Sequence, residues 1–382
     1  MRALRLLPRF LGIVAIASCS GVSLRPEVAS REQPAVVQLT DAERADLAAH
    51  VDRAVDAAVR RRYVEAETEA NAALGIDPRA ARARAVLAMV LLQRAKLQDP
   101  PDSFAANAGE TESLLAERLA PKDAFVGWMR AVFLAEAGHM SAAAAAAEAA
   151  LARTTAAPAA ERAALLGAAG TYRYELGEER AALPHLQAYV GLRPDDASAT
   201  FRIGWCLLRI AEVPEGPNGP LVAQQRAEAA AKAFARCVEL APGDEDAALA
   251  VGAAYLRAAE LAGKRKDFAV RDERRTQADR QFREVAARFP GNAEAMFRLA
   301  VLAEHDGQLA EARAAYEQAL QRDPRHLGSL LNLAAMHDAD GHHVEAEALL
   351  TRALRAAEPA QLTAEERSRI EQRLRSRPPE RP

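Results

Sequence analysis

Residues 293–326 read AEAMFRLAVLAEHDGQLAEARAAYEQALQRDPRH, and their pattern of small and apolar residues returns in the residues that follow. Apolar residues spaced three and four apart indicate helices, and Gly307 marks a turn between two of them. Pro324 closes the unit, because proline lacks the amide donor and cannot extend the preceding helix. The unit is therefore predicted to be two helices joined by a turn. A shift of 34 residues converts Leu299, Ala300, Gly307, Ala312 and Ala319 into Leu333, Ala334, Gly341, Ala346 and Ala353, with the closing proline one place late at Pro359.

Closing prolines recur upstream and divide the chain into eight units of this kind. Extra residues in some units are expected between the two helices of the unit. Residues 212–220, EVPEGPNGP, predict a loop, residues 257–275 predict lengthened helices around a charged turn, and a third insertion lies near residues 98–108. The upstream prolines are Pro78, Pro121, Pro194, Pro242 and Pro290, and the units are residues 47–80, 81–123, 124–157, 163–196, 197–244, 245–292, 293–326 and 327–360.

The period, the small residues at fixed offsets and the closing proline resemble the tetratricopeptide repeat. The resemblance implies an all-α fold, a right-handed superhelical solenoid of about eight helix–turn–helix repeats over residues 41–360. Thr363 and Glu366 form a predicted capping box for a last helix, residues 361–376, which is expected to cover the end of the array. Residues 377–382 carry three prolines and are expected to be a disordered tail.

The first residues of the chain predict a secretory signal peptide. Three arginines precede a short apolar run, and small residues precede Cys19. The order Ile16-Ala17-Ser18-Cys19 resembles the bacterial lipobox, which implies removal of residues 1–18 and acylation of Cys19. Ser20, and not aspartate, follows the cysteine, and this order resembles that of enterobacterial lipoproteins sorted to the outer membrane. An outer-membrane lipoprotein facing the periplasm is therefore expected, with surface exposure left open. Residues 19–40 are expected to be a flexible tether; an ordinary secretory signal with a chance cysteine is the alternative.

Two cysteines remain in the mature chain, Cys206 and Cys237. An oxidising compartment permits a disulfide between them, but its formation depends on a distance that the sequence does not supply. Two small buried residues are the simpler interpretation.

The resemblance also places a ligand groove on the first helix of each repeat. The family positions that face the groove carry neither the lysine nor the asparagine of a carboxylate clamp, so docking of chaperone C-termini is not expected. Apolar and aromatic residues stand there instead, which favours an apolar peptide or helix as ligand. Packing of these residues in the core is the alternative. The expected groove residues are Trp128, Phe201, Trp205, Phe297 and Leu331.

Composition and motifs give little support for catalysis or nucleic-acid binding. The net charge is -3 with both signs interspersed, so no basic stripe is present for nucleic acid. No phosphate loop, nucleophile elbow or paired-cysteine metal motif occurs, and neither a catalytic residue nor a cofactor is predicted. A histidine–acid cluster comprises His337, Asp338, Asp340, His342 and His343, with His305 and Asp306 one repeat earlier. Such residues suit a metal-dependent enzyme, but they equally suit a polar turn.

The sequence thus predicts a membrane-anchored scaffold of the bacterial cell envelope that binds a protein or peptide partner and serves assembly of an envelope or secretion complex. The first alternative is a surface or peptidoglycan-associated binding module outside any secretion machine. The second is the metal-dependent enzyme that would use the C-terminal histidines.

Overall fold

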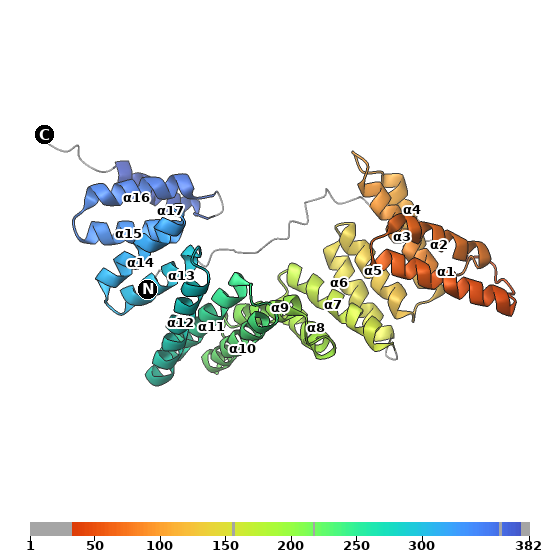
Figure 1. The fold of residues 1–382 in the computed structure, drawn as a ribbon, viewed down its shortest axis with the longest axis horizontal. Helices are drawn as coiled ribbons and strands as arrows, with labels where there is room; N and C mark the ends of the chain where they lie inside the picture. The colour runs from red at the N-terminus through yellow and green to blue at the C-terminus, as the bar shows by residue number, and fades with distance from the viewer. Residues whose placement is uncertain (1–32, 155–156, 217, 359–360, 376–382) are drawn as a thin grey trace. The chain divides into compact units, whose positions relative to one another are not determined.

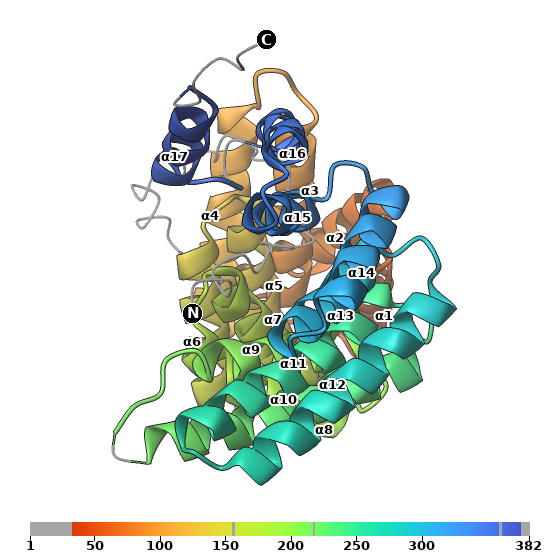
Figure 2. The ribbon, with the colours of Figure 1, turned by 90° about the vertical axis from the view of Figure 1, so that its left-hand side faces the viewer.

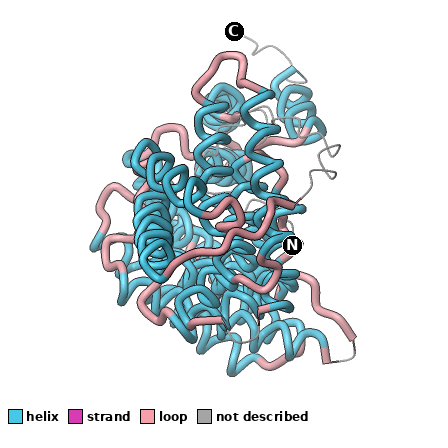
Figure 3. Tube along the Cα trace, turned by 90° about the vertical axis from the view of Figure 1, so that its right-hand side faces the viewer, coloured by secondary structure: helices cyan, strands magenta, loops and turns pink. Residues whose placement is uncertain are grey.

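The computed structural model describes residues 33–154, 157–216, 218–358 and 361–375. These residues form seventeen α-helices and no strand (Figures 1 and 3). The chain divides into two compact units, whose described parts are the N-terminal unit, residues 33–210, and the C-terminal unit, residues 211–375. The expected signal peptide, Cys19 and the expected tail at residues 377–382 lie outside the described residues.

The N-terminal unit contains four helix pairs and one further helix. They are α1 (Asp41–Val59), α2 (Tyr63–Ile76), α3 (Ala81–Lys96), α4 (Ser103–Leu119), α5 (Ala124–Glu136), α6 (Met140–Arg153), α7 (Ala159–Glu175), α8 (Glu179–Leu192) and α9 (Ala197–Ile210).

The C-terminal unit begins with a single helix, continues with three pairs and ends with another single helix. Its helices are α10 (Gly219–Leu240), α11 (Glu245–Lys264), α12 (Phe268–Arg288), α13 (Ala293–His305), α14 (Leu309–Arg322), α15 (Leu327–Ala339), α16 (His343–Ala356) and α17 (Ala364–Arg375).

This order confirms the all-helical repeat fold: within the described residues, helix pairs follow one another along both units and a terminal helix follows the last pair. The first helix, α1, begins at Asp41, where the predicted array begins and ahead of the first repeat boundary at residue 47; α7 likewise begins at Ala159, ahead of the repeat boundary at residue 163. At Asp41 the reason is visible, since the preceding Thr40 and Glu43 form a complete capping box that starts the helix there.

Tight turns join the two helices of most pairs, and each of these turns contains one residue whose backbone has a positive φ, in the left-handed region of φ and ψ. Glycine takes that place in four of them because it lacks a Cβ. Arg61 and Lys266 take it in two others, with φ of 59° and 62°. The glycines are Gly138, Gly177, Gly307 and Gly341.

The first helices of successive pairs pack directly against one another in the N-terminal unit. Contacts join α1 to α3, α3 to α5, α5 to α7 and α7 to α9. Small buried residues permit this close approach, and alanines make up much of the core of the first three pairs. These five helices therefore form one continuous surface, called the helix-A wall below.

The C-terminal unit is built from helices that each pack against the next. Three of them are lengthened: α10, α11 and α12 have 22, 20 and 21 residues, against 13 in α13 and in α15 (Figure 2). The extra residues of the predicted insertions thus largely extend helices.

The terminal helix α17 begins at a capping box of Thr363 and Glu366, and its Ile370 and Leu374 pack against the core formed by α13 to α16. None of the helices in the described ranges combines the length and apolarity needed to cross a bilayer.

Candidate partner-binding surface

The five residues expected in the groove are divided between the two units. Trp128 on α5 and both Phe201 and Trp205 on α9 belong to the N-terminal unit, whereas Phe297 on α13 and Leu331 on α15 belong to the C-terminal unit. The first three therefore share the helix-A wall, and the other two do not lie on it.

Trp128 occupies the middle of the helix-A wall. Its indole lies 5.8 Å from the ring of Phe125 and packs on small residues of α5, α6 and α7, among them Ala131 and Ala168. The side chain remains partly exposed, as does Val132 one turn further along α5. Trp128 thus combines packing between helices with an apolar surface that solvent reaches.

Phe201 and Trp205 form an aromatic pair one turn apart on α9. Their ring centroids lie 6.1 Å apart at an interplanar angle of 77°, an edge-to-face arrangement, and both residues are partly exposed. Residues four apart on a helix share one face, which places the pair together at the last helix of the wall.

Phe297 is a core residue. It is 7% exposed, its ring lies 5.0 Å from that of His326, and a Cβ added at Gly328 would come within 2.8 Å of it. Leu331 is partly exposed and packs on the same core. Sequence position alone did not distinguish Phe297 from Trp128, because burial here depends on Gly328, which lets α13 and the start of α15 approach.

Arg82 forms a charged edge at the amino ends of three wall helices. From α3 it donates to Asp123, the N-cap of α5, at 2.8 Å and to Glu161 in the first turn of α7 at 2.9 Å. Its guanidinium also lies 5.4 Å from the ring centroid of Phe125. Burial disfavours the charge of Arg82, but the two carboxylates outweigh it and raise its pKa. Sequence reasoning did not identify this residue, because its partners lie one and two repeats away.

A second charged edge lies at the carboxyl ends of the wall helices. Lys96 on α3 donates to Glu136 on α5 at 2.6 Å. Burial opposes ionisation of Glu136, but Lys96 outweighs it and holds its pKa below the usual range. Nearby, burial and then the charge of Glu136 raise the pKa of Tyr172 to about 12. The wall therefore presents an apolar band between two edges whose charges are largely paired.

The C-terminal histidines form a turn network in the structure. Asp338 contacts His343 at 3.1 Å and accepts from Arg373 of α17 at 2.5 Å, while Asp340 pairs with Arg313. Within the described residues, no group of three or more His, Cys, Asp or Glu side chains is arranged to hold a metal ion.

Both cysteines are free buried thiols. Burial raises the pKa of Cys206 to about 12 and that of Cys237 to about 11, so neither is a thiolate near neutral pH.

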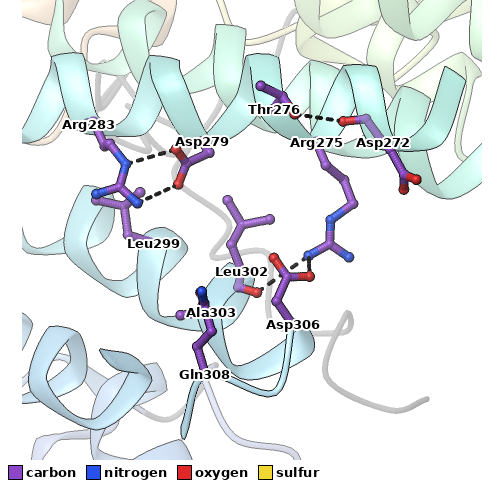
Figure 4. Close-up of a pocket in the computed structure, with 10 residues that line it drawn as sticks. All are labelled: Asp272, Arg275, Thr276, Asp279, Arg283, Leu299, Leu302, Ala303, Asp306 and Gln308. Atoms are coloured by element: carbon purple, nitrogen blue, oxygen red, sulfur yellow. Dashed lines mark hydrogen bonds and ion pairs between the residues drawn. The ribbon is translucent and has the colours of Figure 1, made fainter. Parts of the chain in front are cut away.

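A polar pocket of about 340 Å³ lies between α12 and α13 in the C-terminal unit (Figure 4). Leu299 and Leu302 line it, Arg283 holds Asp279 through two hydrogen bonds of 2.8 and 3.0 Å, and Arg275 reaches across to Asp306 at 2.5 Å. Its hydroxyl group, on Thr276, donates to the backbone carbonyl of Asp272 and not to a base. The repeat pattern gives no signal for this pocket, because its lining residues come from α12 and from the following repeat.

Comparison with protein families identifies part of the array. A tetratricopeptide repeat model matches residues 167–215 and 268–326, and a second tetratricopeptide model matches residues 303–364. The chain contains tetratricopeptide repeats. A search of curated protein sequences found no match.

Several solved structures have related folds, among them the following three. PilF of Pseudomonas aeruginosa is 17% identical, with a TM-score of 0.43 over 67% of this chain and 97% of that chain. YrrB, described as a TPR protein with an unusual peptide-binding site, is 18% identical, with a TM-score of 0.42 over 57% and 95%. MamA of Desulfovibrio magneticus RS-1, residues 41 to the end, is 20% identical, with a TM-score of 0.37 over 51% and 94%. The likeness concerns helical repeats and carries no information on what this chain binds.

Proposed function

We propose that the protein is an interaction scaffold that binds an apolar helix or peptide of a protein partner on the helix-A wall of its N-terminal unit. Helical repeats of this type bind other proteins through such extended surfaces. The observation that carries the proposal is the wall itself: five helices in continuous contact, with partly exposed Trp128, Phe201 and Trp205 on them.

The chemistry of the wall defines the kind of partner. Arg82 and Lys96 at the two edges are already paired with carboxylates of the wall. A partner therefore gains little from added charge and most from apolar side chains that cover the aromatic band. Large aromatic residues are the usual hot spots of such interfaces.

Trp205→Ala tests the wall. If the indole contacts a partner, the change weakens capture of that partner from detergent-solubilised envelopes by about 2 kcal/mol or more. It should cost less in folding than the roughly 3–5 kcal/mol typical of a fully buried aromatic residue. Phe104→Ala is the matched control, because Phe104 is 84% exposed on α4 of the same unit and lies off the wall.

Two outcomes would contradict binding through the wall. A Trp205→Ala protein that loses stability heavily but captures the partner normally whenever it is folded shows Trp205 to be core. Equal weakening by Phe104→Ala would show that the partner does not bind through the wall.

The proposal extends to the cell envelope, where the protein is anchored through an acylated Cys19. Support comes from the sequence that ends at Cys19. Stable anchoring requires more than one acyl chain, which lipoprotein processing supplies. Cys19→Ser should release the protein from membranes in cell fractionation. A mature N-terminus found by mass spectrometry at another residue, without lipid, would contradict the anchor and leave the binding wall unaffected.

A further inference from the structure

The amino end of α10, the carboxyl end of α11 and the amino end of α12 lie together at one end of the C-terminal unit, called the tip below. The second turn of α10 and the α11–α12 turn are joined by Arg265, which donates to the side chain of Gln224. One to two turns further in, Arg274 of α12 holds Glu228 of α10 at 2.8 Å. The tip is therefore a supported part of the fold and not an isolated loop (Figure 2).

Large apolar side chains are exposed on this tip. Phe268, the first residue of α12, is 54% exposed, and Leu221 and Val222 in the first turn of α10 are 38% and 37% exposed. Leu221 lies one turn before Gln224, and Phe268 follows Arg265 by three residues, so the Arg265–Gln224 contact brings the two groups to the same end of the unit. Clustered exposed apolar residues mark an interaction surface more often than isolated ones do.

Basic side chains flank Phe268 in the α11–α12 turn. Residues 264–266 read Lys-Arg-Lys, and Lys264 and Lys266 are both exposed. Arg271 lies over the ring of Phe268 at 4.9 Å from its centroid. The acids of the turn are engaged: Asp267 caps α12 and pairs with Arg265, and Asp272 pairs with Arg271 at 2.7 Å. Glu212 and Glu215 in the loop before α10 oppose this charge, so the basic character is local to the turn.

We propose that this tip patch, formed by Leu221, Val222, Lys264, Lys266 and Phe268, docks on an anionic phospholipid surface. Lysines beside a membrane are attracted to lipid phosphates, and an aromatic or aliphatic side chain inserts at the boundary between headgroups and acyl chains. A nucleic acid would use the lysines but would leave Leu221 and Val222 in water. The combination of charge and aliphatic surface therefore favours lipid.

Vesicle co-sedimentation tests the proposal with the full chain carrying Cys19→Ser, so that no acyl chain contributes to binding. The probes are vesicles of phosphatidylcholine alone and vesicles in which about a third of the lipid is anionic phosphatidylglycerol. The protein should bind the anionic vesicles and should bind them less as salt is raised. Each lysine near the surface contributes a factor of about five, so Lys264→Glu with Lys266→Glu should weaken binding by more than about tenfold. Phe268→Ser should weaken it severalfold while leaving its salt dependence in place.

The matched control is Arg280→Glu with Arg288→Glu. These exposed residues lie toward the other end of α12 and give the same change in charge. Binding by this control should stay within about twofold of the parent, and thermal melts of all variants should coincide because the altered side chains are exposed. The proposal is overturned if the parent protein does not bind anionic vesicles at low salt, or if the control loses as much binding as the tip variants. It is also overturned if Phe268→Ser has no effect while single-stranded RNA competes fully for the lysines, since the patch would then be a polyanion site.

Discussion

Arg130 of α5 donates to both carboxylate oxygens of Glu110 of α4, at 2.5 and 2.8 Å, with only 11% and 9% of the two side chains exposed. Arg130 also reaches the hydroxyl of Ser113 at 3.4 Å. A buried pair of this kind fixes how two helices are rotated against each other, because any other rotation leaves a charge unpaired.

Glu110→Ala should destabilise the second and third helix pairs by about 3–5 kcal/mol, because it leaves the Arg130 guanidinium buried without its partner. Replacing both residues, Glu110→Leu with Arg130→Met, should cost less than Glu110→Ala alone. Hydrogen exchange of the amides of α4 and α5 measures the local effect. As a control, Arg44→Ala removes an exposed pair with Asp41 and should change stability by less than about 1 kcal/mol. A Glu110→Ala protein with unchanged exchange in α4 would show that the pair is dispensable.

The Arg130–Glu110 pair is an example of a contact between repeats that the sequence pattern does not predict. The segment that forms α4 carries Glu110, Thr111 and Ser113 at buried positions, where the helical pattern predicts apolar residues. Arg130 hydrogen-bonds Glu110 and Ser113, and the hydroxyl of Thr111 donates to the backbone carbonyl of Asn107. The period predicts which helices exist and how they pair, since it reflects local hydrogen bonding and the packing of small residues. It cannot predict contacts that arise from particular side chains in neighbouring repeats.

Gly252 of α11 lies against the ring of Phe282 of α12, so that a Cβ there would come within 2.5 Å of the ring. Gly252→Ala should therefore destabilise the C-terminal unit by about 1–3 kcal/mol, because Phe282 is fully buried and has little room to move. Gly191→Ala is the matched control: Gly191 is also in a helix, and nothing lies within 4 Å of its Cβ position. The control should be neutral or more stable by up to about 1 kcal/mol, from helix propensity. Thermal melts of the two variants give the comparison, and equal melting would mean that the ring adjusts without cost.

The candidate site was predicted less completely than the fold. The sequence indicates aromatic residues on the first helices of the repeats, and Phe201 and Trp205 do lie edge to face on α9. The burial of Phe297 depends on a glycine in the next repeat, and the paired edge at Arg82 joins three repeats. Both features depend on how neighbouring repeats meet, which a single-repeat pattern does not contain.

Acid should weaken the attachment of α17, because Asp338 receives hydrogen bonds from the terminal helix. Burial opposes ionisation of Asp338, but the hydrogen bonds from His343 and Arg373 outweigh it and hold its pKa below the usual value. A carboxyl with a lowered folded pKa stabilises the fold above its unfolded pKa of about 3.9, and this contribution is lost as pH falls through the lower folded value. Since Arg373 is 47% exposed, the contribution should be about 1 kcal/mol or less.

Asp338→Asn isolates this effect from the other carboxylates. Thermal melts of the parent and the variant should differ at pH 7 and converge toward pH 3. A constant difference across that range would show that ionisation of Asp338 does not hold α17.

Local stability should vary along the array, because helices in equivalent places bury very different side chains. The buried residues of α6 are all alanines, Ala143, Ala144, Ala147 and Ala150. In α14 the fully buried Tyr316 donates to Glu304 at 2.6 Å and accepts from Asn332 at 2.8 Å. Buried apolar area sets most of the stability of a repeat, at about 25 cal/mol per Å², and repeat stability is local apart from contacts with its neighbours. The amides of α6 should therefore exchange faster than those of α14.

Hydrogen exchange measured by mass spectrometry on the intact protein can resolve the two helices. The same ordering should hold between the first three pairs and the last two, since α2 likewise buries only Ala66, Ala70 and Ala73. Tyr316→Phe provides the internal check: it removes the two hydrogen bonds while keeping the ring, and should speed exchange in α14 without changing α6. Equal protection of α6 and α14 would mean that the neighbours of α6, chiefly the large buried residues of α5, supply the stability that its own alanines lack.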